Sequence, residues 1–549
     1  MKTSKKLFFV FFLLLTPSTS LLTRASDFAQ GRVIGGNPKG RASFRGDVAD
    51  IDIRKAGELQ SMIPPEKIRD IRQMHISGVI NDLDLKFIKT LANRNTVNDS
   101  RGRTVQAWLD LDLRHARIVQ NDRYGRGLPV ETLPNNAFSN WNRLRSIILP
   151  PHLRAIPDYC FSSCSYLEMV EMPPTLEVIG DYAFRSCNKL VEAHIPASVV
   201  EIGRNCFNGC SNLANITLPE RLTIIPSDAF AGTAISQINI PPYVQQIDAR
   251  AFANTNLQQV VIPASVQKLA VSAFNDCQRL TAIVVDTENA VYADADGMLY
   301  DKQFTKLIRC PQGLTGNISL PQTISRIDDS AFANCASITN ILLPRALQQI
   351  GNNAFRGCKS LTQIALPEGL TSIGNDALRD CRALTNVSLP QSLRKIGTSL
   401  FSGCSGLVSV SLPQNLKRLP ERTFKNCTSL QILALPHSLE AIDREAFYAC
   451  KALTDITLPV SLESFGEECF RKCESLQTFE FPRRTNNIGD RMLYDCDALR
   501  EVSIPFITPP KAKHVCDEKH AVLIVPRGQT NAYKKADGWK KFKTIRERY

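Results

Sequence analysis

Long hydrophobic runs are almost absent from this chain of 549 residues. The longest is the nine-residue stretch Leu7 to Leu15, whereas a membrane-spanning helix needs about 20 apolar residues. We therefore expect no integral membrane span. The stretch follows three lysines and precedes small residues near Ala25, which is the layout of a cleavable signal peptide over residues 1–25. The sequence predicts export; secretion, display at the cell surface and retention in a periplasm all remain open.

Histidine is also rare, and the few residues present are spread along the chain. No Ser-His-Asp motif, no Cys-His motif and no phosphate-binding glycine loop accompanies them. We therefore expect no enzyme and no cofactor. The segment from His514 through Cys516 to His520 has metal-like spacing, but one cysteine and two histidines make a weak zinc motif, so a loop without metal is predicted. The histidines are His75, His115, His152, His194, His437, His514 and His520.

What the chain has in abundance is one repeated phrase, approximately L-x-x-I-G-x-x-A-F-x-x-C-x-x-L-x-x-I-x-L-P. Its period is 23 residues, shortened to 22 at two places. A fixed period of 20–29 residues around L-x-x-I-x-L indicates a leucine-rich-repeat solenoid, in which each coil buries its apolar side against its neighbours. The aromatic position is occupied by Phe138, Phe161, Phe184, Phe207, Phe230, Phe252, Phe274, Phe332, Phe355, Leu378, Phe401, Phe424, Phe447, Phe470 and Leu493.

Each unit can be interpreted as a short strand followed by a turn. In Asn215-Ile-Thr217-Leu-Pro219 the alternation buries every second residue, and the proline ends the strand because it lacks an N–H donor. Strands stacked coil on coil would form a parallel sheet on the concave side. The predicted fold class is an α/β solenoid: a right-handed leucine-rich-repeat superhelix with short helical, 3₁₀ or β segments on the convex side and a small helical N-terminal cap.

The seventeen cysteines do not predict a disulfide framework. Twelve of them stand three residues after the aromatic position, and in the two shortened repeats this place is taken by Thr233 and Thr255. Threonine can replace a small buried residue but cannot replace half of a disulfide. The thiols are therefore predicted to be reduced and buried. The twelve are Cys164, Cys187, Cys210, Cys277, Cys335, Cys358, Cys381, Cys404, Cys427, Cys450, Cys473 and Cys496.

Outside the repeats the composition changes. Residues 26–46 are polar and glycine-rich and predict a flexible linker, and residues 47–130 predict a capping region. Within that region we expect one helix entered through Pro64-Pro65, a second helix capped by Asn81 or Asp82, and a strand beginning near Trp108. The tripeptide Arg45-Gly46-Asp47 matches an integrin-binding motif, but three common residues coincide often, so chance is favoured.

The solenoid is predicted over residues 131–510, with one interruption. Phe274 and Phe332 are 58 residues apart, and the intervening chain reads as a β-hairpin insertion at about 286–316 that protrudes from one side. Asp294-x-Asp296-Gly297 resembles the start of a calcium loop but lacks its final acidic residue, so a turn is predicted.

Residues 511–549 predict a basic C-terminal cap. From residue 534 onward seven basic residues face only Asp537 and Glu547. Such a segment can attract anionic glycans, membranes or nucleic acid, but a solvated helix that caps the solenoid also explains the charge and is favoured.

The outward positions of the predicted sheet carry mostly small neutral polar side chains. Such a strip has little charge for nucleic acid and few aromatic rings for stacking on bases or sugars, although it could form many hydrogen bonds to a protein or another polymer. The structural alternative is that these are merely solvated strand positions. The candidate binding residues are Asn215, Thr217, Gln237, Asn239, Asn340, Gln363, Asn386, Ser388, Asp455 and Thr457.

The repeat phrase resembles the BspA-type leucine-rich-repeat proteins. The inserted N-x-x-Y-x-x-x-D-G-x-L-Y, the N-terminal I-S-G-x-I-N-D-x-D and the closing Val525-Pro526-x-Gly528 with Tyr533 and Trp539 agree with that family. The resemblance implies a secreted or surface adhesin of the kind found in Bacteroidota and some mucosal parasites, without shared catalytic residues. The chain departs from some relatives because it lacks a lipoprotein cysteine and a recognisable sorting domain, which leaves its attachment to a surface open.

Two functions therefore remain. The first is an exported, non-enzymatic binding protein, expected to be a monomer, that engages a protein or glycan macromolecule and no nucleic acid. The second is an envelope or periplasmic protein that binds or processes glycans. Processing would require two carboxylates about 5–9.5 Å apart, and Glu171 with Glu192 on adjacent coils is one candidate pair.

Overall fold

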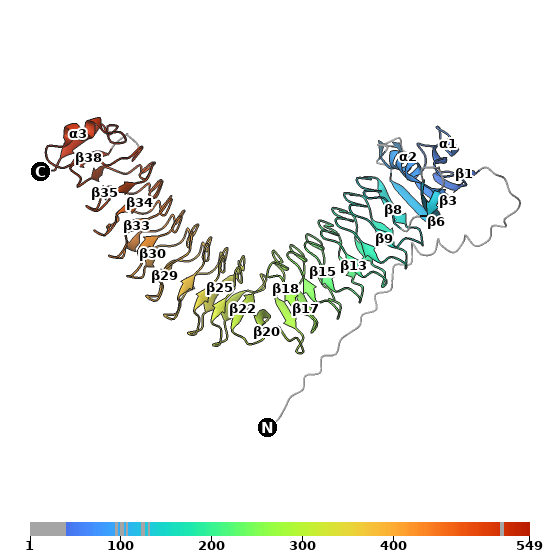
Figure 1. The fold of residues 1–549 in the computed structure, drawn as a ribbon, viewed down its shortest axis with the longest axis horizontal. Coiled ribbons are helices and arrows are strands. Elements are labelled where there is room, and N and C mark those ends of the chain that lie inside the picture. The colour runs from blue at the N-terminus through green and yellow to red at the C-terminus, as the bar shows by residue number, and fades with distance from the viewer. Residues whose placement is uncertain are drawn as a thin grey trace, which may run out of the picture.

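The computed structural model describes residues 40–93, 97–98, 104–105, 108–121, 127–129, 132–516 and 521–548. The predicted signal peptide and residues 26–39 of the predicted linker lie outside these ranges. The described chain is a V-shaped solenoid whose two arms meet near the insertion (Figure 1). We call residues 138–285 the N-terminal arm and residues 310–505 the C-terminal arm.

The N-terminal cap is built mainly on a β-sheet that continues into the first coils. Its strand order is β1-β2-β3-β6-β8-β10, with β7 paired to β6. The pairing is parallel from β2 to β10, whereas β1 and β7 are antiparallel to their neighbours. The strands are β1 (Arg41–Arg45), β2 (Val48–Ile53), β3 (Gln73–Ile80), β6 (Leu109–Asn121), β7 (Gly127–Pro129), β8 (Leu144–Ile148) and β10 (Met169–Glu171); β4 (Val97–Asn98) and β5 (Thr104–Val105) form a separate pair.

Two helices accompany this sheet, α1 (Leu59–Met62) and α2 (Asp82–Ala92). The second confirms the predicted capped helix: the Asn81 side chain accepts from the Leu83 and Asp84 N–H groups, while the Asp84 carboxylate accepts from the Asn81 N–H group. The helix expected to begin at Pro64-Pro65 does not form, because α1 ends before the prolines and residues 65–70 make turns. The linker prediction is wrong for residues 41–45, which form strand β1.

Most regular coils pass through two parallel β-positions. The first β-position corresponds to the I-x-L part of the repeat and forms strands of two to five residues. We call the solvent side of these strands the long-strand face. These strands are β12 (Glu192–His194), β14 (Asn215–Thr217), β17 (Gln259–Ile262), β19 (Ala282–Val285), β23 (Gly316–Ser319), β25 (Ile338–Leu342), β27 (Gln363–Ile364), β29 (Asn386–Ser388), β30 (Ser409–Ser411), β32 (Ile432–Ala434), β35 (Thr478–Glu480) and β37 (Glu501–Ser503).

The second β-position is a two-residue strand before the turn that carries the aromatic residue. Its solvent side is the short-strand face. These strands are β9 (Ala155–Ile156), β11 (Val178–Ile179), β13 (Glu201–Ile202), β15 (Ile224–Ile225), β16 (Gln246–Ile247), β18 (Lys268–Leu269), β24 (Arg326–Ile327), β26 (Gln349–Ile350), β28 (Ser372–Ile373), β31 (Arg418–Leu419), β33 (Ala441–Ile442), β34 (Ser464–Phe465) and β36 (Asn487–Ile488). The predicted parallel solenoid of about 23-residue coils is thus confirmed.

The core is a set of columns running along the solenoid. Neighbouring phenylalanines stack with ring centroids 4.9–5.7 Å apart, from Phe138 to Phe274 in the N-terminal arm and from Phe401 to Phe470 in the C-terminal arm. The cysteines form a second column, all of them free and buried, as predicted. Most ladder thiols donate to the carbonyl of the aromatic residue one coil earlier; Cys187 Sγ, for example, lies 3.1 Å from Phe161 O. These thiols therefore link coils without covalent bonds.

The turns around the aromatic residue use left-handed backbone twice in most coils, two residues before and two residues after the phenylalanine. In one coil these places are Asn205 and Gly209, and in another Arg422 and Asn426. Glycine, asparagine and aspartate adopt this conformation easily, but Arg422 carries a strain of about 1–2 kcal/mol. The coil-to-coil hydrogen bonds of these turns hold such residues in place; the Phe207 N–H group, for instance, donates to Ala229 O.

The insertion forms the predicted antiparallel strands and the predicted Asp-Gly turn. It lies between the two arms instead of protruding from one side, so that part of the prediction is wrong. It consists of β20 (Tyr292–Ala295), β21 (Met298–Asp301) and β22 (Lys306–Arg309), with Asp296 and Gly297 in the tight turn. Leu299 packs in the core of the N-terminal arm, whereas its neighbours Met298 and Tyr300 pack in the core of the C-terminal arm. Because successive side chains of a strand point to opposite sides, one strand closes both cores.

The C-terminal cap adds β38 (Val522–Val525), helix α3 (Thr530–Lys535) and β39 (Thr544–Glu547) to the long-strand series. Tyr533 and Trp539 are completely buried and donate to the carbonyls of Phe506 and Pro510. The apolar face of this segment covers the last coil, and its lysines remain outside. Within the described ranges, no helix is long and apolar enough to cross a membrane.

Candidate binding sites

The long-strand face of the C-terminal arm presents a row of uncharged polar side chains. The row occupies equivalent places on β23, β25, β27, β29 and β30 and consists of Asn317, Asn340, Gln363, Asn386 and Ser409. We call it the polar row. Within it, the Ser409 hydroxyl donates to the Asn386 side-chain oxygen over 2.6 Å. The backbone N–H and C=O groups of these strands bond to the neighbouring strands and do not need the side chains as partners. Most side-chain donors and acceptors of the polar row therefore face solvent.

The ten predicted residues all follow this face of the two arms. Nine are exposed and Asn340 is half-buried. Those on β14, β25, β27 and β29 lie in strands, whereas Gln237, Asn239, Asp455 and Thr457 lie in coils without an assigned strand. The face is not uniformly polar, because Leu342 and Ile432 expose more than half of their surface on it.

Sequence reasoning overlooked the place where this face is widest, the sheet of the N-terminal cap. A hollow of about 1150 Å³ lies over β1, β2, β3, β6 and β8, and we call it the cap hollow. Its floor contains two rows of side chains. One row is Asp50–His75–Asp112–Ile148 and the other is Gln73–Asp110–Ser146, each member lying opposite the next across neighbouring strands.

The charged groups of the cap hollow hold one another in place. Arg145 Nε lies 2.9 Å from Asp110 Oδ1, and the Ser146 hydroxyl donates to the same oxygen over 2.7 Å. Arg114 Nε lies 2.9 Å from Asp112 Oδ2. The hydrogen bond that Arg145 donates to Asp110 raises the pKa of Arg145 despite its partial burial. The hollow is therefore a preorganised set of donors and acceptors.

His75 and Asp50 form a second pair at the other side of the hollow, with Nδ1 and Oδ1 2.7 Å apart. Burial by itself would raise the pKa of Asp50, but hydrogen bonds from His75 and Arg45 outweigh it, and the pKa lies below its usual value. Asp50 is thus an anion at neutral pH, well suited to accept hydrogen bonds.

A sequence signal for this hollow exists in retrospect. Asp50-Ile-Asp52-Ile and Asp110-Leu-Asp112-Leu alternate acidic and apolar residues, which places both acids of each strand on one solvent face. That the two strands flank β3, with His75 between Asp50 and Asp112, follows only from the tertiary pairing.

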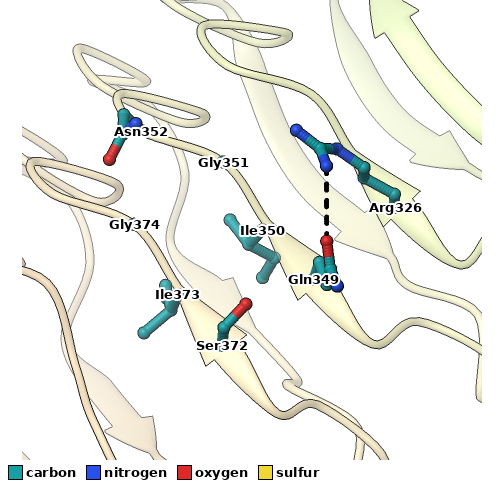
Figure 2. Close-up of a pocket in the computed structure, with 8 residues that line it drawn as sticks. All are labelled: Arg326, Gln349, Ile350, Gly351, Asn352, Ser372, Ile373 and Gly374. Atoms are coloured by element: carbon teal, nitrogen blue, oxygen red, sulfur yellow. Dashed lines mark hydrogen bonds between the residues drawn. The ribbon is translucent and has the colours of Figure 1, made fainter.

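A much smaller hollow of about 180 Å³ lies on the short-strand face, over β24, β26 and β28. Figure 2 shows the Arg326 guanidinium directed to the Gln349 side-chain oxygen, 3.4 Å away, with Ser372 on the next strand. Gly351 and Gly374 form its upper edge, where a Cβ would collide with the preceding coil. These glycines serve coil packing, and the hollow is too shallow to enclose a ligand.

The candidate carboxylate pair for glycan processing is not enclosed. Glu171 and Glu192 are both exposed on the long-strand face, and Glu192 Oε1 lies 3.8 Å from His194 Nε2. The catalytic carboxyl groups of glycan-processing enzymes lie in enclosed, partly apolar clefts, whereas both of these side chains are open to solvent. The Arg45-Gly46-Asp47 tripeptide lies at the exposed turn between β1 and β2.

Comparison with known proteins identifies the repeats. The sequence model described as "BspA type Leucine rich repeat region (6 copies)" matches residues 131–255, 245–295, 310–431 and 400–509, more than half of the chain. No curated protein matches the sequence.

Three solved structures are similar to this chain. A leucine-rich cell surface protein from Faecalibacterium prausnitzii is 22% identical, with 74% of this chain and 95% of that chain covered at a TM-score of 0.50. A leucine-rich-repeat protein from Eubacterium ventriosum is 25% identical, with 63% and 89% covered at a TM-score of 0.48. One from Bacteroides ovatus is 21% identical, with 95% and 100% covered at 0.41. The first of these similarities shows the fold alone. On the strength of the repeat match, the chain belongs to the BspA-type leucine-rich-repeat family.

Proposed function

We propose that the protein is an exported, non-enzymatic binding protein of the adhesin type that engages a host or bacterial macromolecule along its long-strand face. The observation that carries the proposal is the polar row. Across neighbouring coils it presents amide and hydroxyl groups at the strand spacing of about 4.8 Å, with the coil-to-coil backbone hydrogen bonds already made beneath it. Such a row suits an extended partner that makes many modest contacts.

Export is supported by the signal-like residues 1–25, and the similar protein from Faecalibacterium prausnitzii is a cell surface protein. The partner is a protein or a glycan polymer, and we expect the binding protein to act as a monomer. The described face offers no enclosed pair of carboxylates, so binding without chemistry is the better account of its residues.

The experiment is a capture assay followed by mutation of the captured interaction. Mature protein is immobilised and exposed to purified host matrix proteins and to bacterial envelope fractions. The double variant Asn386→Lys with Asn215→Lys places bulky charges on both arms of the face and should weaken binding at least tenfold, with little change in stability.

The matched control is Lys534→Gln with Lys535→Gln, which removes two charges on exposed positions of α3 where the double variant adds two. It should leave binding intact. Loss of binding in this control, together with a steep dependence on salt, would transfer the site to the basic C-terminal cap and refute the proposal for the long-strand face.

A further inference from the structure

We infer that the cap hollow is a second, separate binding site, and that its ligand is a segment of neutral polysaccharide. The inference does not depend on the polar row, since the two surfaces lie on different parts of the solenoid. The cap hollow measures about 1150 Å³, above the range of about 300–1,000 Å³ typical of sites for single small molecules. It is also open along the sheet, so a chain of linked units fits it better than one compact molecule.

The groups that line the hollow match paired hydroxyls. Asp110 with Arg145 and Asp112 with Arg114 place an acceptor beside a donor at fixed distance. Neighbouring hydroxyls of a sugar ring both donate and accept, so they can bridge such a pair. A carboxylate has about four acceptor sites, and the internal hydrogen bonds leave some of them for a ligand. The Ser77 hydroxyl, 3.2 Å from Asp52 Oδ1, adds another group of this kind.

The charge balance favours a neutral ligand. Four carboxylates line the hollow, and three guanidinium groups together with His75 and His115 stand among them. Because opposite charges alternate at contact distance, the hollow has no extended field of one sign to attract a polyanion or a polycation. The carboxylates are Asp50, Asp52, Asp110 and Asp112, and the guanidinium groups are those of Arg41, Arg114 and Arg145.

A protein partner is disfavoured because the hollow lacks an anchor pocket. Protein interfaces obtain most of their binding energy from aromatic or aliphatic side chains in desolvated pockets. Ile51, Ile76 and Leu111 are buried beneath the sheet, and Ala42 packs against the same core, so the apolar side chain that reaches the surface of the hollow is that of Ile148.

Trp108 supplies the remaining element of a sugar site. The other two tryptophans are completely buried, whereas Trp108 exposes 38% of its surface. Arg145, which lines the hollow, lies 4.8 Å from the centroid of its ring, and Arg72 lies 5.2 Å away. These contacts fix the indole beside the hollow, where its exposed part can pack on the C–H groups of a sugar ring.

The test uses the full mature chain with yeast mannan, laminarin and arabinogalactan as neutral probes, heparin as a polyanion and fibronectin as a protein. We expect at least one neutral polysaccharide to bind, with an affinity that changes less than twofold between 0.05 and 0.5 M salt. The variant Asp110→Asn with Asp112→Asn keeps the shape of the hollow and should weaken this binding at least tenfold; Trp108→Ala should weaken it about threefold or more.

Asp228→Asn, which removes a similar surface carboxylate paired with Arg250 on the N-terminal arm, is the matched control and should bind normally. Asn386→Lys should also bind normally, which separates failure of this inference from failure of the proposed function. The inference is overturned if none of the three neutral polysaccharides binds, if they bind equally to the double variant, or if only heparin or fibronectin depends on Asp110 and Asp112. Thermal melting and circular dichroism establish that each variant is folded.

Discussion

The two arms of the solenoid have nearly the same interior, but the charged residues of their long-strand faces lie at different places along the arm. Both stack phenylalanine rings at 4.9–5.7 Å and bury a column of thiols. On the N-terminal arm the charged residues of the long-strand face, Glu171, Glu192 and His194, lie on the coils next to the cap. On the C-terminal arm the uncharged polar row comes first, and Asp455, Glu480 and Glu501 follow toward the C-terminal end. The difference shows that the repeat fixes what is buried and leaves the outward positions free to diverge.

The cores of the two arms are separate and end at the same strand. Strand β21 separates them, with Leu299 on one side and Tyr300 on the other. In a solenoid, each coil is stabilised chiefly by its neighbours. Strand β21 should therefore limit how far a defect in one arm spreads into the other.

The largest effect is expected from breaking one phenylalanine column. Phe401→Ala in the C-terminal arm and Phe184→Ala in the N-terminal arm should each cost about 3–5 kcal/mol, because both side chains are completely buried. Hydrogen exchange should show loss of protection in the mutated arm, declining before β21. Equal loss of protection along the whole chain in either variant would contradict the separation of the arms.

The C-terminal arm contains a buried carboxylate, Glu445, whose contribution to stability should be lost in acid. Glu445 is almost fully buried and lies 3.1 Å from Arg422 Nε and 3.2 Å from Arg444 Nε, and Lys425 also contacts it. Burial alone would raise its pKa, but the hydrogen bonds from Arg422 and Lys425 outweigh burial and lower the pKa to about 2. Glu445→Gln should destabilise the C-terminal arm by about 2 kcal/mol at pH 7, because three cations lose their shared partner.

The pH dependence follows from the direction of that shift. The folded pKa lies below the unfolded value of about 4.5, so the stabilisation is complete above pH 4.5 and is lost as the pH falls toward 2. Denaturant titrations of the wild-type protein and of Glu445→Gln, followed by hydrogen exchange in each arm, measure the free energy of unfolding. The difference in this free energy between the two proteins should disappear as the pH falls from 4.5 to 2. A deficit of constant size over this range would show that the loss is one of packing and not of charge.

The cysteine column offers a smaller and more local comparison. In the 22-residue coils of the N-terminal arm the Thr233 hydroxyl donates to Phe230 in its own coil, whereas the Cys404 thiol donates to Leu378 in the preceding coil. Cys404→Thr should therefore cost about 1–2 kcal/mol by exchanging a coil-to-coil contact for a local one. The reverse change, Thr233→Cys, should cost less, because a thiol suits that small buried site.

Thiol labelling checks the state of the column at the same time. Burial raises the pKa of Cys404 and most of its ladder neighbours well above the usual value, so a native sample at pH 8 should label slowly. Denaturation without reductant should release all seventeen thiols. Recovery of several fewer would mean that disulfides connect the coils.

The smallest effect concerns the left-handed turns. Ser330 in the C-terminal arm has φ of 58°, and Gly232 in the N-terminal arm has φ of 71° with space for a Cβ. Ser330→Gly should stabilise its arm by about 1 kcal/mol, and Gly232→Ala should destabilise its arm by about the same amount. Changes of the same sign in both variants, measured by chemical denaturation, would show that side-chain contacts outweigh backbone strain.

The sequence by itself determined the solenoid, its coil length and its core. The spacing of Phe, Cys and Pro repeats often enough that each coil confirms the next, and the Thr233 and Thr255 replacements were sufficient to predict free thiols. The capped helix α2 could also be predicted, because Asn81 and Asp84 form hydrogen bonds with backbone groups close to them in the sequence. Such features depend on local patterns or on contacts one period away.

Only the tertiary structure decided the features that join distant or irregular segments. The insertion has alternating apolar residues like any hairpin, and nothing local shows that both sides of β21 are buried in different cores. The cap hollow arises because β3 lies between β2 and β6, which brings Asp50, His75 and Asp112 into one row. The physical reason is the same in both cases: a strand's own sequence sets which residues share a face, but the partners it pairs with set what that face meets.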